Sequence, residues 1–413
     1  MTEVEAAISR LAREESGHVL ALLANRFRDL DLADESVQDA LLEAVEAWGR
    51  SGIPDNPPAW LHTVARNKAI DRLRRAASAR RRMLAAAPDL TARPDEDGQA
   101  DMIVDYREVG DEHLRLLLLC CHPALDRDAQ VALTLRLVGG LTTPEIAAAF
   151  LLPEATLAQR IVRAKRKIRD AGIPLSVPEN LDERVDALLT VLYLVFNEGY
   201  LPRGATDAAV RVDLVDEAIR LTRQAAELLP DSAEVEGLLA LELFSRARTG
   251  SRTDAAGELV LLEHQDRTSW DLDTIEQGNR VLVAALARMR PGPFQLQAII
   301  AAHHANARTA ADTDWAAIAG TYAQLAQVTG SAVVALNHAV AVSMADGPRA
   351  GLAMLDRIAG LEGYHLFHAA RAELLANAGD VDAAATAFRA ARALAANPAE
   401  QRHLDRRIAA LSL

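Results

Sequence analysis

The sequence predicts an all-α fold. Half of its 413 residues are hydrophobic but only 4% are aromatic, and alanine and leucine dominate over β-branched residues. This composition favours helices over strands. Apolar residues also recur at helical spacing, as at Leu157, Ile161, Ala164 and Ile168. A chain of this length has room for about two to four domains.

The N-terminal segment predicts a small helical bundle. Residues 1–30 form amphipathic helices, and residues 29–35 form an acidic turn in which Asp34 caps a helix from Glu35 to Trp48. The positions of this helix expected in the core are Val37, Ala40, Leu41, Ala44, Val45 and Trp48. Its opposite face carries the acids Asp39, Glu43 and Glu46. That face is either a solvated surface or a docking surface for a basic partner.

A proline-rich loop, residues 51–58, leads into a basic helix predicted over 59–75. Its core-facing stripe consists of Trp60, Leu61, Val64, Ile70 and Leu73. Between residues 60 and 82 eight basic residues stand against one acid. Its polar residues are Arg66, Asn67, Lys68, Arg72, Arg74 and Arg75. Cations and an amide beside a tryptophan suit a phosphate backbone and unpaired bases.

Residues 83–110 lose helical periodicity and contain two prolines and an acidic run, which predicts a flexible linker. Helices resume at Asp111, and Asp126 or Asp128 caps the second of them, which ends at Gly139-Gly140. Cys120 and Cys121 are adjacent, so they cannot pair without strain and lack the spacing of a zinc site. We expect two reduced thiols in the core.

Residues 139–168 predict a helix-turn-helix. Thr142 or Thr143 caps the first helix, the segment Leu151-Leu152-Pro153 breaks the chain, and a second helix runs from Glu154 to Asp170. The second helix carries six basic residues, with acids only at its two ends. Docking in the major groove requires a helix with an apolar face toward its partner helix and a cationic outer face. The alternative is a solvated basic helix.

The charge of the chain is unevenly distributed. The net charge is −13, but residues 1–172 hold 24 basic and 27 acidic residues, and the rest hold 21 and 31. Basic residues cluster at 66–82 and 160–169, and such local clusters decide phosphate binding. No apolar run is long enough for a membrane span, and the acidic N-terminus does not resemble a signal peptide. A cytoplasmic protein is expected.

These segments resemble regions two and four of bacterial sigma factors of the extracytoplasmic-function (ECF) group. The similarity is carried by SVQDALLEAVEAW (36–48), PAWLHTVARNKAIDRLRR (58–75) and LTTPEIAAAFLLPEATLAQRIVRAKRKI (141–168). The resemblance implies that the partners of this protein are core RNA polymerase and promoter DNA. It places the polymerase-binding residues at Asp39, Glu43 and Trp48. It places the −10 contacts at Trp60, Arg66, Asn67, Lys68, Arg72 and Arg75, and the −35 contacts at Thr156, Gln159, Arg160, Arg163 and Lys165.

The second half predicts further helices, at 181–196, 213–229, 234–248, 255–264, 271–289, 294–308 and 314–328. The end of the chain repeats with a period of 34 residues, which pairs Ala350 with Ala384 and Met354 with Phe388. This is the tetratricopeptide period, best seen at 331–364 and 365–398. Such stacks form a concave surface that holds a peptide or protein segment; a solenoid that only packs on the rest is the alternative.

The predicted domains are a region-two domain (1–82), a linker (83–110), a region-four domain (111–172), a second linker (173–180) and a tetratricopeptide-like regulatory domain (181–413). The whole resembles those ECF sigma factors that carry such a C-terminal extension. Its segments CCHPAL (120–125), LYLVFNEGY (192–200), QDRTSWD (265–271) and GPFQLQAIIAAHHA (292–305) extend the similarity.

No enzymatic motif accompanies these features. His303-His304 and the pair His365 and His368 lack the carboxylate of a zinc-protease motif, and we find no phosphate-binding glycine loop or nucleophile elbow. We therefore expect no catalysis, no metal and no cofactor. The alternative function is a tetratricopeptide adaptor whose helix-turn-helix binds an operator without polymerase. Such a protein has no need of the helix pair at 35–75.

Overall fold

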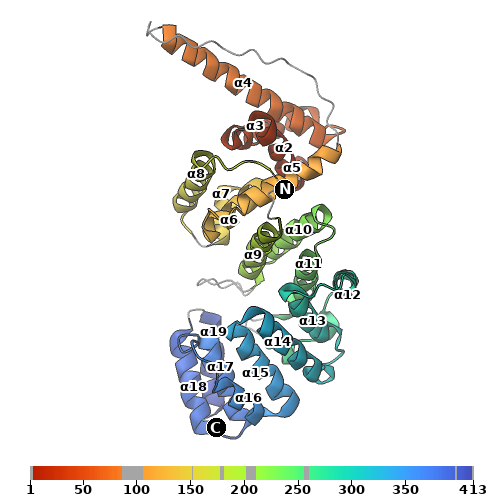
Figure 1. Ribbon diagram of the computed structural model, residues 1–413, viewed down its shortest axis with the longest axis vertical. Coiled ribbons are helices and arrows are strands. Elements are labelled where there is room, and N and C mark those ends of the chain that lie inside the picture. Colours follow the sequence, from red (N-terminus) through yellow and green to blue (C-terminus); the bar gives the residue numbers. More distant parts are fainter. Residues whose placement is uncertain are drawn as a thin grey trace. The chain divides into compact units, whose positions relative to one another are not determined.

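The computed structural model describes residues 3–85, 106–150, 152–176, 181–200, 211–254, 260–395 and 398–411. The chain divides into two compact units, Met1–Val191 and Leu192–Leu413. Apart from one isolated bridge residue, Thr253, all regular elements of the described residues are helices (Figure 1). The predicted all-α class is therefore confirmed. Over the same residues, no helix combines the length and the apolarity that a membrane crossing requires.

The first unit begins with four helices: α1 (Glu3–Glu14), α2 (Ser16–Phe27), α3 (Leu30–Ser51) and α4 (Pro57–Ala85). The start of α3 corrects the sequence prediction. Asp29 is its N-cap and accepts a hydrogen bond from the Leu32 amide at 2.9 Å, so the acidic turn belongs to the helix. Asp34 consequently lies inside α3, and only 7% of it is exposed. Helix α4 also runs ten residues past the predicted end at Arg75.

Buried apolar side chains on α2, α3 and α4 form the core of these helices, including Leu23, Val37 and Leu61. The predictions that Val45 and Leu73 face the core are wrong, because 54% and 45% of these residues are exposed. The predicted linker 83–110 is helical at both ends, through Ala85 and from Tyr106, and residues 86–105 lie outside the described part.

The rest of the first unit contains α5 (Tyr106–Cys120), α6 (Arg127–Leu133), the π-helical segment η1 (Thr134–Val138), α7 (Thr143–Ala149) and α8 (Glu154–Asp170). Asp126 caps α6 by accepting a hydrogen bond from the Ala129 amide at 2.8 Å. Both cysteines are buried and free, as predicted. Burial raises the pKa of Cys121 to about 12 and also raises that of Cys120, so both are thiols at neutral pH.

Helix α9 (Leu181–Tyr200) carries the chain into the second unit. There follow α10 (Val212–Leu228), α11 (Ala233–Arg246), α12 (Leu272–Ala287), α13 (Pro293–Asn306) and α14 (Trp315–Thr329). Short 3-10 turns lie between them, namely η2 (Thr249–Ser251), η3 (Leu262–His264), η4 (Arg267–Ser269) and η5 (Ala310–Asp312). The helix predicted over 255–264 is reduced to η3, and residues 255–259 lie outside the described part.

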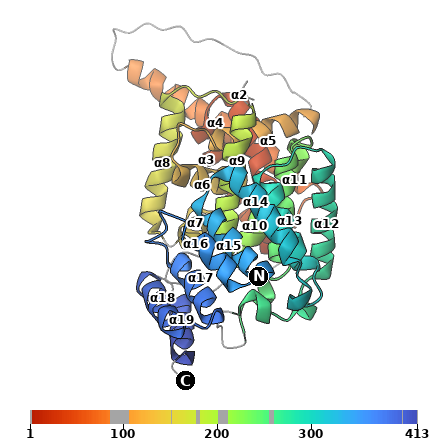
Figure 2. The same ribbon diagram turned by 60° about the horizontal axis from the view of Figure 1, so that its bottom comes forward.

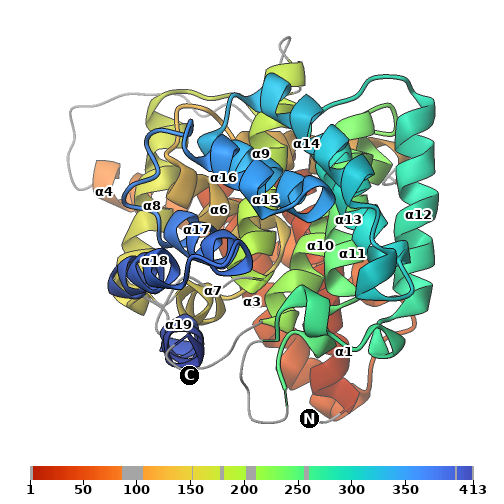
Figure 3. The ribbon, with the colours of Figure 1, turned by 90° about the horizontal axis from the view of Figure 1, so that it is seen from below.

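The end of the chain consists of α15 (Ala332–Asp346), α16 (Pro348–Leu355), α17 (His365–Asn377), α18 (Val381–Leu394) and α19 (Pro398–Ala410). Helices α15 to α18 form two successive helix-turn-helix pairs (Figures 2 and 3). Gly347 and Gly379 turn the chain with φ of +98° and +89°. At Gly351 a Cβ would lie 2.7 Å from the Ala339 carbonyl oxygen, so a small residue is required where α16 crosses α15. The tetratricopeptide assignment stays a prediction.

A buried carboxyl group gives the second unit a testable pH dependence. Glu242 on α11 is fully buried, and burial raises its pKa well above the usual value, although a hydrogen bond from Thr222 at 3.1 Å opposes this. The stability that protonated Glu242 contributes is fully present below the pKa of this group in the unfolded chain. It is lost as the pH rises through the pKa of the folded protein. We expect Glu242→Gln to raise the unfolding midpoint at pH 8.5 but not at pH 4.5. Thermal unfolding of the exposed-site control Glu227→Gln should show no such difference.

Candidate nucleic-acid interface

Helices α7 and α8 form the predicted helix-turn-helix. Thr142 accepts a hydrogen bond from the Glu145 amide at 3.3 Å, and the Glu145 carboxylate accepts one from the Thr142 amide at 2.7 Å, which makes a capping box. Helix α8 has the predicted bounds, Glu154–Asp170. Its predicted apolar face is buried, at Leu157, Ile161, Ala164 and Ile168. Leu151, in the predicted break, lies outside the described residues.

The outer face of α8 presents polar and basic side chains to solvent. Thr156, Gln159 and Arg163 are exposed, and Arg163 donates a hydrogen bond to Gln159 at 3.3 Å. Arg160 is half-buried and forms an ion pair with Asp128 at 3.0 Å. The sequence analysis missed Val162, which is 64% exposed on this face. Val162 lies three residues after Gln159, which places it on the same face of the helix, but the sequence prediction considered only polar residues there.

Lys165 does not belong to this outer face, although the sequence analysis placed it among the DNA contacts. Only 9% of it is exposed, because it shares the side of α8 that carries Ile161 and Ile168. Its ammonium group contacts the Asp34 carboxylate of α3 and lies 3.6 Å from Asp31. In this arrangement the Lys165 charge is taken up by α3 and is not available to phosphates.

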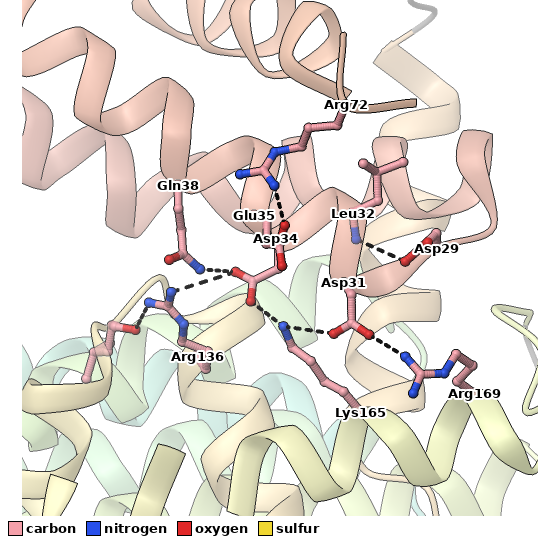
Figure 4. A network of polar contacts seen from close by, with 11 residues as sticks. Asp29, Asp31, Leu32, Asp34, Glu35, Gln38, Arg72, Arg136, Lys165 and Arg169 are labelled. Atoms are coloured by element: carbon pink, nitrogen blue, oxygen red, sulfur yellow. Dashed lines mark hydrogen bonds and ion pairs between the residues drawn. The ribbon is translucent and has the colours of Figure 1, made fainter. Parts of the chain in front are cut away.

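Asp34 is the centre of a polar network that joins α3 to the helix-turn-helix segment (Figure 4). Besides Lys165, its carboxylate accepts a hydrogen bond from Gln38 and lies 3.8 Å from the Arg136 guanidinium. Arg136 also donates to the Leu141 carbonyl at 2.9 Å. At the edge of the network Arg169 pairs with Asp31 at 2.8 Å. We call the contact of α1–α3 with the segment 112–170 the seam.

Close backbone packing accompanies the seam network. Gly140 has a φ of +68°, and a Cβ there would lie 2.0 Å from the Ala12 carbonyl oxygen. At Gly17 a Cβ would lie 2.8 Å from the Val138 carbonyl oxygen. Asn25 of α2 donates a hydrogen bond to Glu112 of α5 at 2.8 Å. The seam therefore depends on glycines at two positions as well as on buried charges.

The acids of α3 pair with the bases of α4. Arg72 donates to the Asp39 carboxylate at 2.7 and 3.2 Å and also pairs with Glu35, while Lys68 pairs with Glu43. The hydrogen bond to Asp39 raises the pKa of Arg72. The predicted polymerase contacts Asp39 and Glu43 are thus engaged with two of the predicted −10 contacts. All four of these predicted residues remain partly exposed.

The remaining predicted residues divide into exposed and buried groups. Asn67 and Arg75 are exposed on α4, and Arg66 is half-buried there. Trp60 is half-buried and meets Trp48 edge to face, with 5.4 Å between ring centroids. Trp48 is only 2% exposed, so it cannot itself contact polymerase in this arrangement. In this arrangement Trp48 supports Trp60 from the core, and its assignment to polymerase binding stays a prediction.

An apolar surface on α3 was also missed. Leu42 is 68% and Val45 is 54% exposed, although both are large and apolar. They lie three residues apart, on one side of the helix, and the exposed acid Glu46 adjoins them. Exposed apolar residues with a charged rim mark protein-interaction surfaces more often than scattered single residues do. The pattern was hidden because Leu41 and Ala44 also fit a core stripe.

Comparison with known protein families matches three segments of the chain. Residues 11–79 match sigma-70 region 2, and residues 115–168 match sigma-70 region 4. Residues 184–286 match a family of unknown function, DUF6596. The first two matches cover the exposed apolar surface of α3, the bases of α4 from Arg66 to Arg75 and the outer face of α8 from Thr156 to Arg166.

Among similar proteins are the ECF RNA polymerase sigma factors SigK of Mycobacterium ulcerans and Mycobacterium tuberculosis (strain H37Rv). The first is 29% identical over 158 residues, which cover 37% of this chain and 78% of that relative. The second is 27% identical over 171 residues, which cover 40% of this chain and 86% of that relative. Sigma-70 regions 2 and 4 on one chain, together with this similarity, support an ECF-like sigma factor with a role in transcription initiation.

A further relative is similar along nearly the whole chain. The uncharacterized protein R00370 of Rhizobium meliloti (strain 1021) is 42% identical over 388 residues, which cover 93% of this chain and 91% of the relative. The chain belongs to the same family as R00370. Because this match covers 93% of the chain, the similarity includes most of the second unit.

Proposed function

We propose that this protein recruits core RNA polymerase through α3, reads the −35 duplex with α8 and captures the melted −10 strand with α4. The observation that carries the proposal is the exposed polar and basic face of α8, held by the buried seam and the capped α7. The matches to both sigma-70 regions, in this order, support it over an operator-binding adaptor. An operator binder would have no use for the region-2 helices.

For the −35 element we assign the outer face of α8. Arg163 and Arg166 are exposed and supply charge to phosphates or guanine edges. Thr156 and Gln159 supply hydrogen bonds, and Val162 supplies an apolar contact such as a thymine methyl accepts. Arg160 remains a candidate because its partner Asp128 is itself exposed, so the pair exchanges readily with phosphate.

For the −10 element we assign the exposed polar side of α4. Asn67 and Arg75 reach solvent, Lys68 and Arg72 are partly exposed, and Trp60 offers part of its ring for stacking. Stacking of an unpaired base on an aromatic ring contributes about 1–3 kcal/mol, which offsets part of the cost of melting. Arg66 completes the basic set on this helix.

We further propose that the seam opens when promoter DNA binds. Separating α8 from α3 would return Lys165 to solvent and make it available to phosphate, so its predicted role in DNA binding would apply to the open state. The domain boundaries predicted from sequence would then mark parts that move: 1–82, 111–172 and 181–413. We propose that residues 181–413 are a tetratricopeptide-like regulatory domain whose groove binds a peptide or protein segment. We also propose that the protein is cytoplasmic.

The assignment on α8 predicts a contrast between the exposed arginines of α8 and an exposed arginine elsewhere in the chain. Replacing Arg163 and Arg166 together by alanine should weaken binding to −35 duplex at least tenfold and lower the salt dependence, because two phosphate contacts are lost. The measurement is a fluorescence-anisotropy titration of the full chain, at several salt concentrations, on DNA selected by the protein itself. The matched control is Arg349→Ala, an exposed arginine of the second unit. Equal affinity of the double variant and the wild type would remove α8 from the interface.

The proposed function as a whole is tested by run-off transcription with core RNA polymerase. The full chain should initiate on the selected DNA, whereas an operator binder would bind the DNA without initiating. A truncation ending near Leu175 would report what the second unit does. Greater activity of the truncation would make that unit an inhibitor, and loss of activity would make it a required part. Failure of the full chain to bind core polymerase would contradict the proposal.

A further inference from the structure

A group of arginines and aromatic rings in the second unit has no role in the proposed function. Its members lie at or near the ends of α9, α11 and α13 and at η4, and hydrogen bonds join the segment around η4 to the ends of α11 and α13. The Asp271 amide donates to the Ala247 carbonyl oxygen at 3.0 Å, and Arg267 donates to the His304 carbonyl oxygen at 2.6 Å. Four of its members, Tyr200, Arg267, Trp270 and His304, lie in the sequence segments 192–200, 265–271 and 292–305, which no other site uses.

Arg248 and Arg252 both lie against Tyr200. The Arg252 guanidinium carbon is 4.0 Å from the centre of the Tyr200 ring, and that of Arg248 is 5.7 Å from it. Tyr200 is 7% exposed and both arginines are half-buried. A guanidinium stacked on a ring keeps its N–H groups free in its own plane, where they match a carboxylate or a phosphate.

Within the described residues, neither of these guanidinium groups has a carboxylate or other hydrogen-bond partner. The Arg252 Nε atom is buried without one. By contrast, six other half-buried arginines of the second unit pair with a carboxylate, namely Arg220, Arg246, Arg288, Arg371, Arg392 and Arg407. Partly desolvated charge without a counter-charge is unfavourable, and an anion would relieve it.

A third arginine adds positive charge to the same place. Arg267 lies 4.8 Å from the Trp270 ring and is held by the carbonyl oxygens of His304 and Ala307, at 2.6 and 2.9 Å. Burial and the charge of Arg248 lower the pKa of Arg267, while Asp312 opposes this. Asp312 is the acid that faces this group on the Arg267 side.

The neighbouring histidine does not add charge at neutral pH. Burial, followed by the charges of Arg248 and Arg267, lowers the pKa of His304 to about 4. A neutral imidazole is a hydrogen-bond donor or acceptor beside an anion. Two buried nitrogen atoms here have no partner among the described residues, His304 Nδ1 and Trp270 Nε1. The group thus offers free donors as well as charge.

We propose that Arg248 and Arg252, with Arg267 beside them, bind the carboxylate or phosphate group of a small molecule. Half-buried guanidinium groups on an almost fully buried tyrosine suit a small anion better than a large surface does. Residues 173–413 hold 21 basic and 31 acidic residues, so nucleic acid and acidic proteins meet net repulsion around the site. The second unit would then carry a metabolite site, independent of the DNA and polymerase contacts.

The test is the thermal unfolding of the full chain with sodium phosphate or sodium succinate, against sodium chloride of equal ionic strength. At 10 mM we expect at least one of the two anions to raise the midpoint by about 2–4 °C. A rise with phosphate alone identifies a phosphate ligand, and a rise with succinate alone a carboxylate. Isothermal titration should show at least a tenfold loss of affinity in Arg248→Gln and in Arg252→Gln.

The matched control is Arg223→Gln, an exposed arginine bonded only to Gln277, which should bind the anion like the wild type. Should a glutamine variant fail to fold, the lysine variant of the same arginine keeps the charge but loses the fork, and its affinity should still fall. The proposal is overturned if neither anion exceeds chloride, or if the arginine variants bind as the wild type does. Because neither DNA nor polymerase enters the readout, such a failure leaves the sigma-factor function untouched.

Discussion

Replacing Leu42 by arginine should lower the affinity for core RNA polymerase by about 30-fold or more. Leu42 is 68% exposed on α3 beside Val45, so most of its side chain lies outside the core. An apolar anchor at the centre of an interface contributes about 2 kcal/mol or more, which corresponds to this loss. The measurement is binding of labelled full-length chain to purified core polymerase.

The control for this experiment is Leu73→Arg on α4, where the leucine is 45% exposed and lies outside the proposed docking surface. Both variants introduce the same charge on a surface helix, so both should unfold at the wild-type temperature. Equal losses in the two variants would mean that the added charge acts non-specifically. No loss in Leu42→Arg would remove the α3 surface from the interface. Asp39→Arg is a less clean probe, because it also releases Arg72.

Local signals were sufficient for the helix-turn-helix. The capping residues Thr142 and Glu145 are three positions apart, Pro153 precedes a helix start, and one apolar face continues to Ile168. Each of these signals acts within one or two turns of helix. The bounds of α8 and its buried face could therefore be predicted from the sequence alone.

The position of Asp34 could not be predicted in this way. The run from Asp29 to Glu35 offers several residues that cap a helix equally well, and the choice of Asp29 became visible only in the fold. The partner of Asp34 is Lys165, 131 residues away. A lysine within a basic helix predicts DNA contact by its neighbours, and only packing against α3 removes it from that face.

Side-chain exposure on α3 was ambiguous for a similar reason. Leu41, Ala44 and Val45 all fit a core stripe, and the fold buries Ala44 while it exposes Val45. The arginine site of the second unit was beyond sequence reasoning, because Tyr200, Arg248 and Arg267 come from separate elements without a shared spacing. By contrast, glycine is a local turn signal, and Gly347 and Gly379 both turn the chain with positive φ.

Replacing Asp34 by asparagine should open the seam and strengthen binding to −35 duplex by about 10- to 100-fold. The Asp34 and Lys165 side chains are only 10% and 9% exposed. Removing one partner of a buried ion pair costs about 3–5 kcal/mol, because the other charge is left buried. This cost falls on the closed arrangement alone, since opening returns Lys165 to water. Apparent affinity rises as the binding-competent fraction rises.

Opening can be measured separately from DNA binding. Dyes on cysteines introduced by Arg50→Cys and Lys167→Cys, both at exposed positions, report the separation of α3 and α8 by energy transfer. Labelling should be selective, because Cys120 and Cys121 are buried and their pKa values are raised. Asp216→Asn is the control, since its pair with Arg246 lies outside the seam, is partly exposed and contributes only about 0–1 kcal/mol. Unchanged energy transfer in Asp34→Asn, or weaker DNA binding despite opening, would show that the seam does not restrain α8.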